Sequence, residues 1–218
     1  MRVETFPLGE LEANAYLVLA RASERDDTSK TAVVIDPGDD PTRLIERIRR
    51  DGLALAAILL THGHWDHIMG VGEMRAAFDA PVYLHEADLP LYLHVVEQAE
   101  LFGFRAERQP TPDRQVKDGD VIEAGPFRVE VIHTPGHTPG GVCYRLASTS
   151  EPGEVVFVGD TIFAGGVGRT DLPGGSWQQL LGSIRQRIFT LGDTVTLYPG
   201  HGPPTTVGKE RTSNPFLL

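Results

Sequence analysis

The sequence predicts an α/β fold in which two mixed β-sheets pack face to face and helices cover both outer sides, which makes four layers. Three observations predict it. Nine short apolar segments are too many strands for one small sheet, helical segments are interspersed among them, and neither long polar stretch separates two cores. A chain of 218 residues with 40% hydrophobic content can form one substantial core, so we expect one domain over residues 1–218.

The predicted strands are short runs in which apolar residues are continuous or alternate with polar ones. They cover residues 2–6, 14–20, 31–35, 55–60, 81–84, 127–133, 142–147, 154–159 and 194–198. The run 55–60 is wholly apolar, which is typical of a strand buried on both faces. Polar residues predict a hairpin loop over 21–30 and a longer surface excursion over 104–114.

Apolar residues at helical spacing predict four helices. These helices cover residues 41–50, 67–78, 86–102 and 176–191. In the first, Leu44, Ile45 and Ile48 share one face, and we interpret the basic cluster 47–50 as the solvated side. Ser176 stands where the last helix begins, a position at which a serine hydroxyl accepts a hydrogen bond from the first turn.

The composition excludes several classes of partner. A net charge of −10 argues against nucleic acid and anionic membranes, and no apolar run approaches the length of a membrane span. The N-terminal residues do not resemble a signal peptide, and the single cysteine, Cys143, cannot build a disulfide framework. We therefore expect a cytoplasmic protein with Cys143 as a buried structural thiol. No feature of the sequence indicates an oligomeric state.

Residues 61–67 read Thr-His-Gly-His-Trp-Asp-His, which places four potential metal ligands in six positions. Imidazole nitrogens and carboxylate oxygens are the ligands that a borderline divalent metal prefers, and imidazoles this close repel one another once protonated. The run follows the predicted strand 55–60 and precedes a predicted helix, so we expect it on a loop at the carboxyl end of a strand. Ligands in α/β proteins commonly bind there.

Three further segments end predicted strands and carry one donor each: 134–140, 158–161 and 198–203. Taken singly, each donor is better explained as a turn or cap residue, but together with 61–67 they form a set. The set comprises His62, His64, Asp66, His67, His137, Asp160 and His201. A closed structural zinc site takes four ligands, so seven donors favour two metals with open coordination positions.

Other polar residues have competing interpretations. His85, His94 and His133 lie outside the glycine-flanked segments, and packing roles suffice for them. Asp36 is either a hydrogen-bond partner of a ligating histidine or a turn residue ahead of Pro-Gly. Trp65 is expected to pack or to shape the mouth of the pocket.

The spacing His62-x-His64-x-Asp66-His67, followed by His137, Asp160 and His201, resembles the metallo-β-lactamase superfamily, and the likeness extends over essentially the whole chain. It implies the αββα sandwich of that family. It also implies two metals: His62, His64 and His137 would hold one, Asp66, His67 and His201 the other, and Asp160 and a water would bridge them. The ions implied are zinc, with iron or manganese as alternatives.

The chemistry that this resemblance implies is hydrolysis, because two ions sharing one water supply hydroxide near neutral pH. Asp66 would act as the catalytic residue that orients the water or carries its proton. True β-lactamases of the fold usually lack a histidine after the aspartate and carry cysteine in place of Asp160, and flavodiiron proteins have glutamate in place of His64. The full set, with the segment 165–173, is similar to glyoxalase II, which hydrolyses small-molecule thioesters such as S-lactoylglutathione.

The chain departs from glyoxalase II in one respect: only 17 residues follow His201 (218 − 201), whereas that enzyme has a further helical domain that binds glutathione. Lys209 and Arg211 are the basic residues of this tail, and either a solvated tail or a glutathione contact fits them. Arg169 either contacts a substrate carboxylate or pairs with Asp171, and we favour the ion pair.

The main alternative is a persulfide dioxygenase acting on glutathione persulfide, which shares the fold and uses one non-haem iron. Its ligands would be His62, His137 and Asp160, a two-histidine, one-carboxylate triad. A non-enzymatic metal-binding or interaction module predicts a saturated or a broken site, and here no ligand is missing. Nucleases of this fold usually have added nucleic-acid-binding regions, which this acidic chain lacks.

Overall fold

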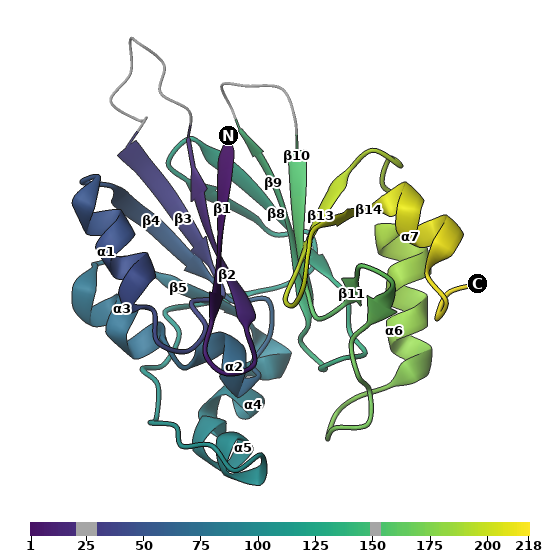
Figure 1. Cartoon of the computed structure of the whole chain (residues 1–218), viewed down its shortest axis with the longest axis horizontal. Coiled ribbons are helices and arrows are strands. Elements are labelled where there is room, and N and C mark those ends of the chain that lie inside the picture. The colour runs from purple at the N-terminus through teal and green to yellow at the C-terminus, as the bar shows by residue number, and fades with distance from the viewer. Residues whose placement is uncertain (21–29, 149–153) are drawn as a thin grey trace.

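The computed structural model describes residues 1–20, 30–148 and 154–218. Two six-stranded sheets pack face to face, with α1 (Thr42–Arg50) and α3 (Val71–Ala77) outside one sheet, and α6 (Trp177–Ser183) and α7 (Val207–Ser213) outside the other (Figure 1). The expected four-layer α/β arrangement is therefore confirmed. The hairpin loop expected over 21–30 lies almost wholly outside the described residues.

The first sheet has the strand order β1-β2-β3-β4-β5-β6. Its strands are β1 (Arg2–Leu8), β2 (Ala13–Leu19), β3 (Thr31–Ile35), β4 (Ala54–Leu59), β5 (Val82–His85) and β6 (Arg114–Val116). The three strands β1 to β3 pair antiparallel, whereas β3 to β6 pair parallel. The carboxyl ends of β3, β4 and β5 consequently lie at the same edge.

The second sheet has the order β14-β13-β10-β9-β8-β7. Its strands are β7 (Val121–Ala124), β8 (Phe127–His133), β9 (Val142–Ser148), β10 (Glu154–Gly159), β13 (Thr196–Pro199) and β14 (Thr205–Thr206). Only β10 and β13 pair parallel, and the other neighbours are antiparallel. A small ribbon of β11 (Ile162–Phe163) and β12 (Gly166–Val167) follows β10.

The sequence underestimates the number of strands. The nine predicted strands are present, but β6, β7, β11, β12 and β14 were not predicted. These five contain four residues or fewer, too few to show a period, and β6 begins where the excursion over 104–114 ends. The tail is also more ordered than expected, because α7 begins after Thr206, whose hydroxyl accepts a hydrogen bond from Lys209 N.

Three predicted helices are interrupted. The segment 67–78 forms α2 (Trp65–Ile68) and α3, because the chain breaks at Gly70, whose amide donates to the Gly38 carbonyl. The segment 86–102 forms a 3₁₀ turn η2 (Glu86–Asp88), α4 (Leu89–Leu93) and α5 (Val95–Leu101). The last helix passes from α6 into a π-helical turn, η3 (Ile184–Ile188), and Ser176 caps it as predicted.

The core has a central layer between the sheets and one layer under each set of helices. Tyr16, Phe127 and Phe157 are fully buried in the central layer. Cys143 is buried under α6 as expected, and burial raises the pKa of its thiol to about 11. Within the described residues, each helix is too short or too polar to cross a membrane.

Hydrogen bonds between the sheets tie their facing edges together. Asn14 N donates to the Gly200 carbonyl at 2.7 Å, and the Tyr16 hydroxyl donates to the Pro199 carbonyl at 2.5 Å. On the other side of the edge, Val142 N donates to the Thr61 carbonyl at 2.8 Å. The loops that leave both sheets at this edge are therefore held in one place.

A buried carboxylate holds the second sheet's outer helix. Glu210 of α7 is fully buried and accepts hydrogen bonds from Thr205 Oγ1, Gly165 N and Asn214 Nδ2. Glu210→Gln should lower the free energy of unfolding by about 1–3 kcal/mol, because an amide nitrogen cannot accept from these donors. Urea unfolding measures this, and Glu123→Gln on exposed β7 is the control. Equal unfolding midpoints for the two variants would contradict the prediction.

Candidate metal centre

The segment 61–67 crosses from β4 to α2 and directs its four donors to one side. The ring centroids of His62 and His67 lie 4.3 Å apart, and those of His62 and His64 lie 4.9 Å apart. One expectation needs correction: only His62 and His64 lie on the loop, whereas Asp66 and His67 lie in the first turn of α2. A carboxylate in a first turn is stabilised by the positive end of the helix dipole.

The ends of β8, β10 and β13 bring the other three donors to the same place. Asp160 lies between the others, with Oδ1 3.5 Å from His67 Nε2 and Oδ2 3.5 Å from His137 Nε2. On its far side, His201 Nε2 lies 3.8 Å from Asp160 Oδ2 and 3.3 Å from Asp66 Oδ2. All seven residues singled out in the sequence therefore converge.

Within this set, two groups have donor atoms that lie within 4.8 Å of one another. These groups are His62 with His64 and His137, and Asp66 with His67 and His201. His64 Nδ1 and His137 Nε2 are only 2.8 Å apart, so the two nitrogens face a common point. We call these groups the first and the second cluster. Asp160 faces both of them.

The buried atoms of the site fit metal ions. His62 Nε2, His67 Nε2 and Asp160 Oδ1 are buried and lack a hydrogen-bond partner in the described part of the chain. Native proteins rarely leave buried polar atoms unpaired, because each one loses its hydration without compensation. Coordination of a cation would satisfy all three atoms, and imidazole with carboxylate is a donor set that divalent metals accept.

The outward ring nitrogens of the histidines are held by hydrogen bonds. His137 Nδ1 donates to the Arg169 carbonyl at 2.7 Å, and His201 Nδ1 donates to the Leu11 carbonyl at 3.1 Å. His67 Nδ1 lies 3.1 Å from Asp36 Oδ2. Each bond fixes the ring orientation and leaves Nε2 free to bind a metal.

Asp36 has both of the roles considered for it. Besides contacting His67, it accepts hydrogen bonds from Thr61 N at 2.7 Å and Thr61 Oγ1 at 2.6 Å. Thr61 Oγ1 in turn lies 3.0 Å from His62 Nδ1, so Asp36 also orients His62 indirectly. The residue is at a turn as well, with a φ of +45° that non-glycine residues rarely adopt.

The two clusters differ electrostatically. Burial and the neighbouring histidines place the pKa of His62 well below its ordinary value, and burial with His137 lowers that of His64 to about 3. Burial opposes protonation of His67 too, but the carboxylates of Asp66, Asp160 and Asp36 raise its pKa to about 10. His62 and His64 of the first cluster are therefore neutral nitrogen donors, whereas the second cluster is surrounded by negative charge.

Glycines allow the close approach of the strand ends. A Cβ on Gly200 would overlap Asp160 Oδ1 and lie 2.7 Å from His67 Cε1. A Cβ on Gly168 would overlap the Asp160 carbonyl and lie 3.0 Å from His137 Nδ1. A side chain at either position would displace a donor, which explains why glycine accompanies the ligands.

The residues assigned to packing lie outside the clusters. His85 and His133 stack at 4.2 Å, and His94 Nδ1 bonds the Pro90 carbonyl at 2.7 Å. Trp65 packs on Phe104 at 4.7 Å.

One basic residue near the site and one in the tail form ion pairs. Arg169 forms a two-bond ion pair with Asp171, which confirms the favoured interpretation. Arg211 of α7 pairs with Asp193 rather than lying in a solvated tail.

Sequence reasoning missed one buried polar residue beside the site. Asp88 accepts hydrogen bonds from Gly63 N and from Thr138 Oγ1, which neighbour the ligands. It occurs within a stretch that we expected to be a single helix, and no local pattern distinguishes a buried aspartate there from an exposed one.

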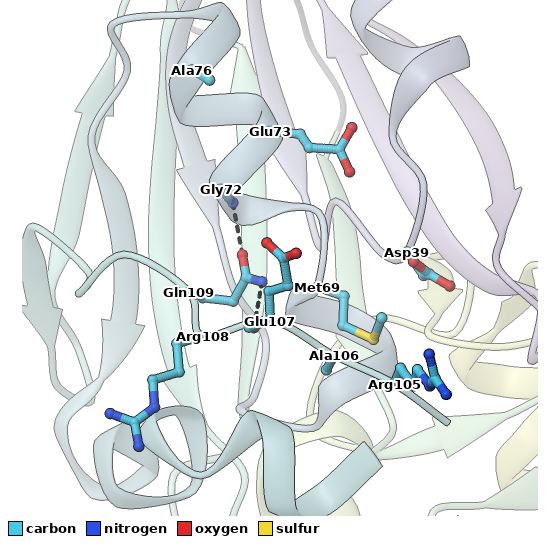
Figure 2. A pocket seen from close by; sticks show the side chains of 10 residues that line it. All are labelled: Asp39, Met69, Gly72, Glu73, Ala76, Arg105, Ala106, Glu107, Arg108 and Gln109. Atoms are coloured by element: carbon cyan, nitrogen blue, oxygen red, sulfur yellow. Dashed lines mark hydrogen bonds between the residues drawn. The ribbon is translucent and has the colours of Figure 1, made fainter. Parts of the chain in front are cut away.

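A charged groove of about 590 Å³ lies beside α3, between that helix and the segment 105–109 (Figure 2). Its charged residues are Asp39, Glu73, Arg105, Glu107 and Arg108. Met69 also lines it and stands three residues after Asp66 in the chain. None of the seven donors lines the groove.

Comparison with known proteins places this site in a family. The model of the metallo-β-lactamase superfamily matches residues 8–205. The hydroxyacylglutathione hydrolase GloC of Haemophilus influenzae is 36% identical over 219 residues, covering 100% of this chain and 98% of that protein. A relative described as the probable metallo-hydrolase YqgX, from Bacillus subtilis, is 37% identical, with 100% and 98% coverage.

Two solved structures share the whole fold. The BLEG-1 B3 metallo-β-lactamase superimposes with a TM-score of 0.88 at 37% identity and covers 100% of both chains. TTHA1623 in a di-iron-bound form gives a TM-score of 0.84 at 40% identity, covering 99% of this chain and 100% of that one. With one cluster of three histidines, one of two histidines and an aspartate, and this fold, the chain belongs to the metallo-β-lactamase superfamily.

Proposed function

We propose that this metallo-hydrolase cleaves hydroxyacyl thioesters, with S-lactoylglutathione as a representative substrate. The observation that carries the proposal is the position of Asp160, whose two carboxylate oxygens face the first and the second cluster. The name of the Haemophilus influenzae relative supports the thioester. The net charge of −10 supports a small-molecule substrate over nucleic acid or a membrane, and the reduced buried thiol supports a place in the cytoplasm.

In this proposal the first cluster would hold one divalent ion and the second would hold another, with Asp160 available as a ligand on the side of each cluster. Bound there, the ions would supply hydroxide near neutral pH and polarise the thioester carbonyl. Zinc suits the imidazole and carboxylate donors, and the di-iron-bound relative makes iron the alternative.

The residues of the chain have separate tasks in hydrolysis. Asp66 is partly exposed beside His201 and orients the attacking water through its carboxylate oxygen. The water oxygen adds to the carbonyl carbon, the carbon–sulfur bond breaks, and the water proton passes to the thiolate through Asp66. The products are a hydroxy acid and a free thiol, and no separate nucleophilic side chain is needed.

The charged groove gives the thiol half of the substrate a place to bind. A glutathione tripeptide in extended form spans about 10 Å. Met69, which lines the groove, stands three residues after Asp66, so the backbones of these two residues lie within that reach. Arg105 and the carboxylates around it match the carboxylates and the ammonium group of glutathione.

The direct test measures metal content and activity together. The purified protein should contain close to two metal ions per chain and release free thiol from S-lactoylglutathione. Elemental analysis and a thiol-specific reagent measure these. A single iron with oxygen uptake on glutathione persulfide would instead establish the dioxygenase. Hydrolysis of a β-lactam but not of the thioester would also overturn the proposal.

Substitution of Asp160 should abolish enzymatic activity and metal binding together. Asp160→Ala leaves each cluster without the carboxylate between them, so we expect loss of activity and of bound metal together. His94→Ala, outside both clusters, is the matched control and should retain metal and activity nearly intact. Metal loading of Asp160→Ala equal to that of the unmutated protein would refute the bridging position.

Arg105→Ala should raise KM for S-lactoylglutathione by about two- to fivefold, the effect of one exposed ion pair, and leave kcat unchanged. The lactoyl thioester of the uncharged thiol N-acetylcysteamine should show no change, because it has no carboxylate for Arg105 to bind. Arg128→Ala, at an exposed residue of β8, is the control variant. An equal rise in KM for both thioesters would show that Arg105 does not bind the carboxylate of glutathione in the groove.

A further inference from the structure

Asp88 is a carboxylate with no exposed surface, at the end of η2 where α4 begins. Its Oδ2 accepts hydrogen bonds from Gly63 N at 2.9 Å and from Thr138 Oγ1 at 2.8 Å. Its Oδ1 accepts one from Gly140 N at 2.5 Å. All three partners donate, so the group that fits here is an ionised carboxylate.

The partners of Asp88 belong to the two segments that carry the first cluster. Gly63 lies between His62 and His64, and Thr138 directly follows His137. One carboxylate therefore connects the loop after β4 in the first sheet with the loop after β8 in the second.

The glycines next to these ligands make room for Asp88. A Cβ on Gly140 would lie 2.5 Å from Asp88 N, and one on Gly63 would lie 3.0 Å from the Asp88 carbonyl. Either substitution would push Asp88 away from its donors. The hydrogen bonds of Asp88 therefore depend on residues from three separate segments of the chain.

The segment 86–101 also binds the backbone carbonyl of Gly63, through a second side chain. Gln98 Nε2 donates to the Gly63 carbonyl at 3.0 Å and to the Leu91 carbonyl at 2.7 Å. Both backbone polar groups of Gly63 are therefore bound by residues of the segment 86–101. The rotation of the Gly63 backbone, which sets the directions of His62 and His64, is fixed from outside the loop.

We propose that Asp88 is the positioning residue of the first cluster: it fixes the two loops that present His62, His64 and His137 to a metal ion. This inference rests on the assignment of ligands in the proposed function. Asp88 does not reach the ion itself, and it acts through the backbone of Gly63 and Gly140 and the hydroxyl of Thr138.

Asp88 also contributes charge to the site. Asp36, Asp66, Asp88 and Asp160 are four carboxylates in or beside the centre, with a formal charge of −4 against +4 for two divalent ions (2 × 2). Three of them contact the second cluster, where His67 lies within hydrogen-bonding or ion-pair distance of each. Asp88 supplies the corresponding negative charge on the side of the first cluster.

Asp88→Asn tests the proposal, because the amide cannot accept from all three donors. Titration of the metal-free full-length protein with Co²⁺, followed by visible absorption, measures the affinities of both sites. We expect the Co²⁺ affinity of the site formed by the first cluster to fall by about 10–100-fold, the effect typical of residues that support metal ligands. The other site should change much less.

Glu210→Gln is the matched control. Glu210 is an equally buried carboxylate with three donors, but its donors do not adjoin the ligands of the first cluster. Both variants should lose stability in urea, and only Asp88→Asn should lose Co²⁺ affinity selectively. Wild-type affinity at both sites of folded Asp88→Asn, or an equal loss in Glu210→Gln, would overturn the inference.

Thr138→Val provides a milder test if Asp88→Asn does not fold. It removes one donor to Asp88 and keeps the shape of the side chain, so the same site should weaken severalfold. Unchanged affinity in this variant would contradict the proposal. Failure of the unmutated protein to bind Co²⁺ would refute the proposed function itself, so the two failures are distinguishable.

Discussion

The crowding of seven donors dictates much of the surrounding structure. Among the described residues, His62 Nε2, His67 Nε2 and Asp160 Oδ1 are buried without hydrogen-bond partners, an arrangement that is unfavourable unless a cation neutralises it. Hydrogen bonds from the ring nitrogens to Asp36 and to the carbonyls of Arg169 and Leu11 hold the imidazoles in these positions. Glycine occurs wherever a side chain would separate the strand ends, as at Gly200.

The sequence predicted the layers and the donors because both leave regular signals. Apolar periodicity marked the longer strands and helices, and 61–67 concentrates ligands in a way that packing alone does not require. The sequence did not predict short elements such as β6 or the break at Gly70, because those depend on contacts with distant segments. Asp88 was missed for the same reason: its three donors come from residues 25 to 52 positions away.

The two clusters are supported in different ways. Asp36 contacts His67 directly and His62 through Thr61, so it orients one ligand of each cluster. The segment 86–101 holds the first cluster through Asp88 and Gln98, which bind the two polar groups of one glycine. The strand ends bring the ligands together, and these hydrogen bonds determine their directions.

The clusters also draw their donors from both sheets. In the first, two histidines follow β4 of one sheet and the third follows β8 of the other, and the second cluster is divided in the same manner. An ion bound to either group would join the two halves of the sandwich, as a cross-link does. The stability of the folded chain would then depend on the free metal concentration, and chelation would loosen the contact between the sheets.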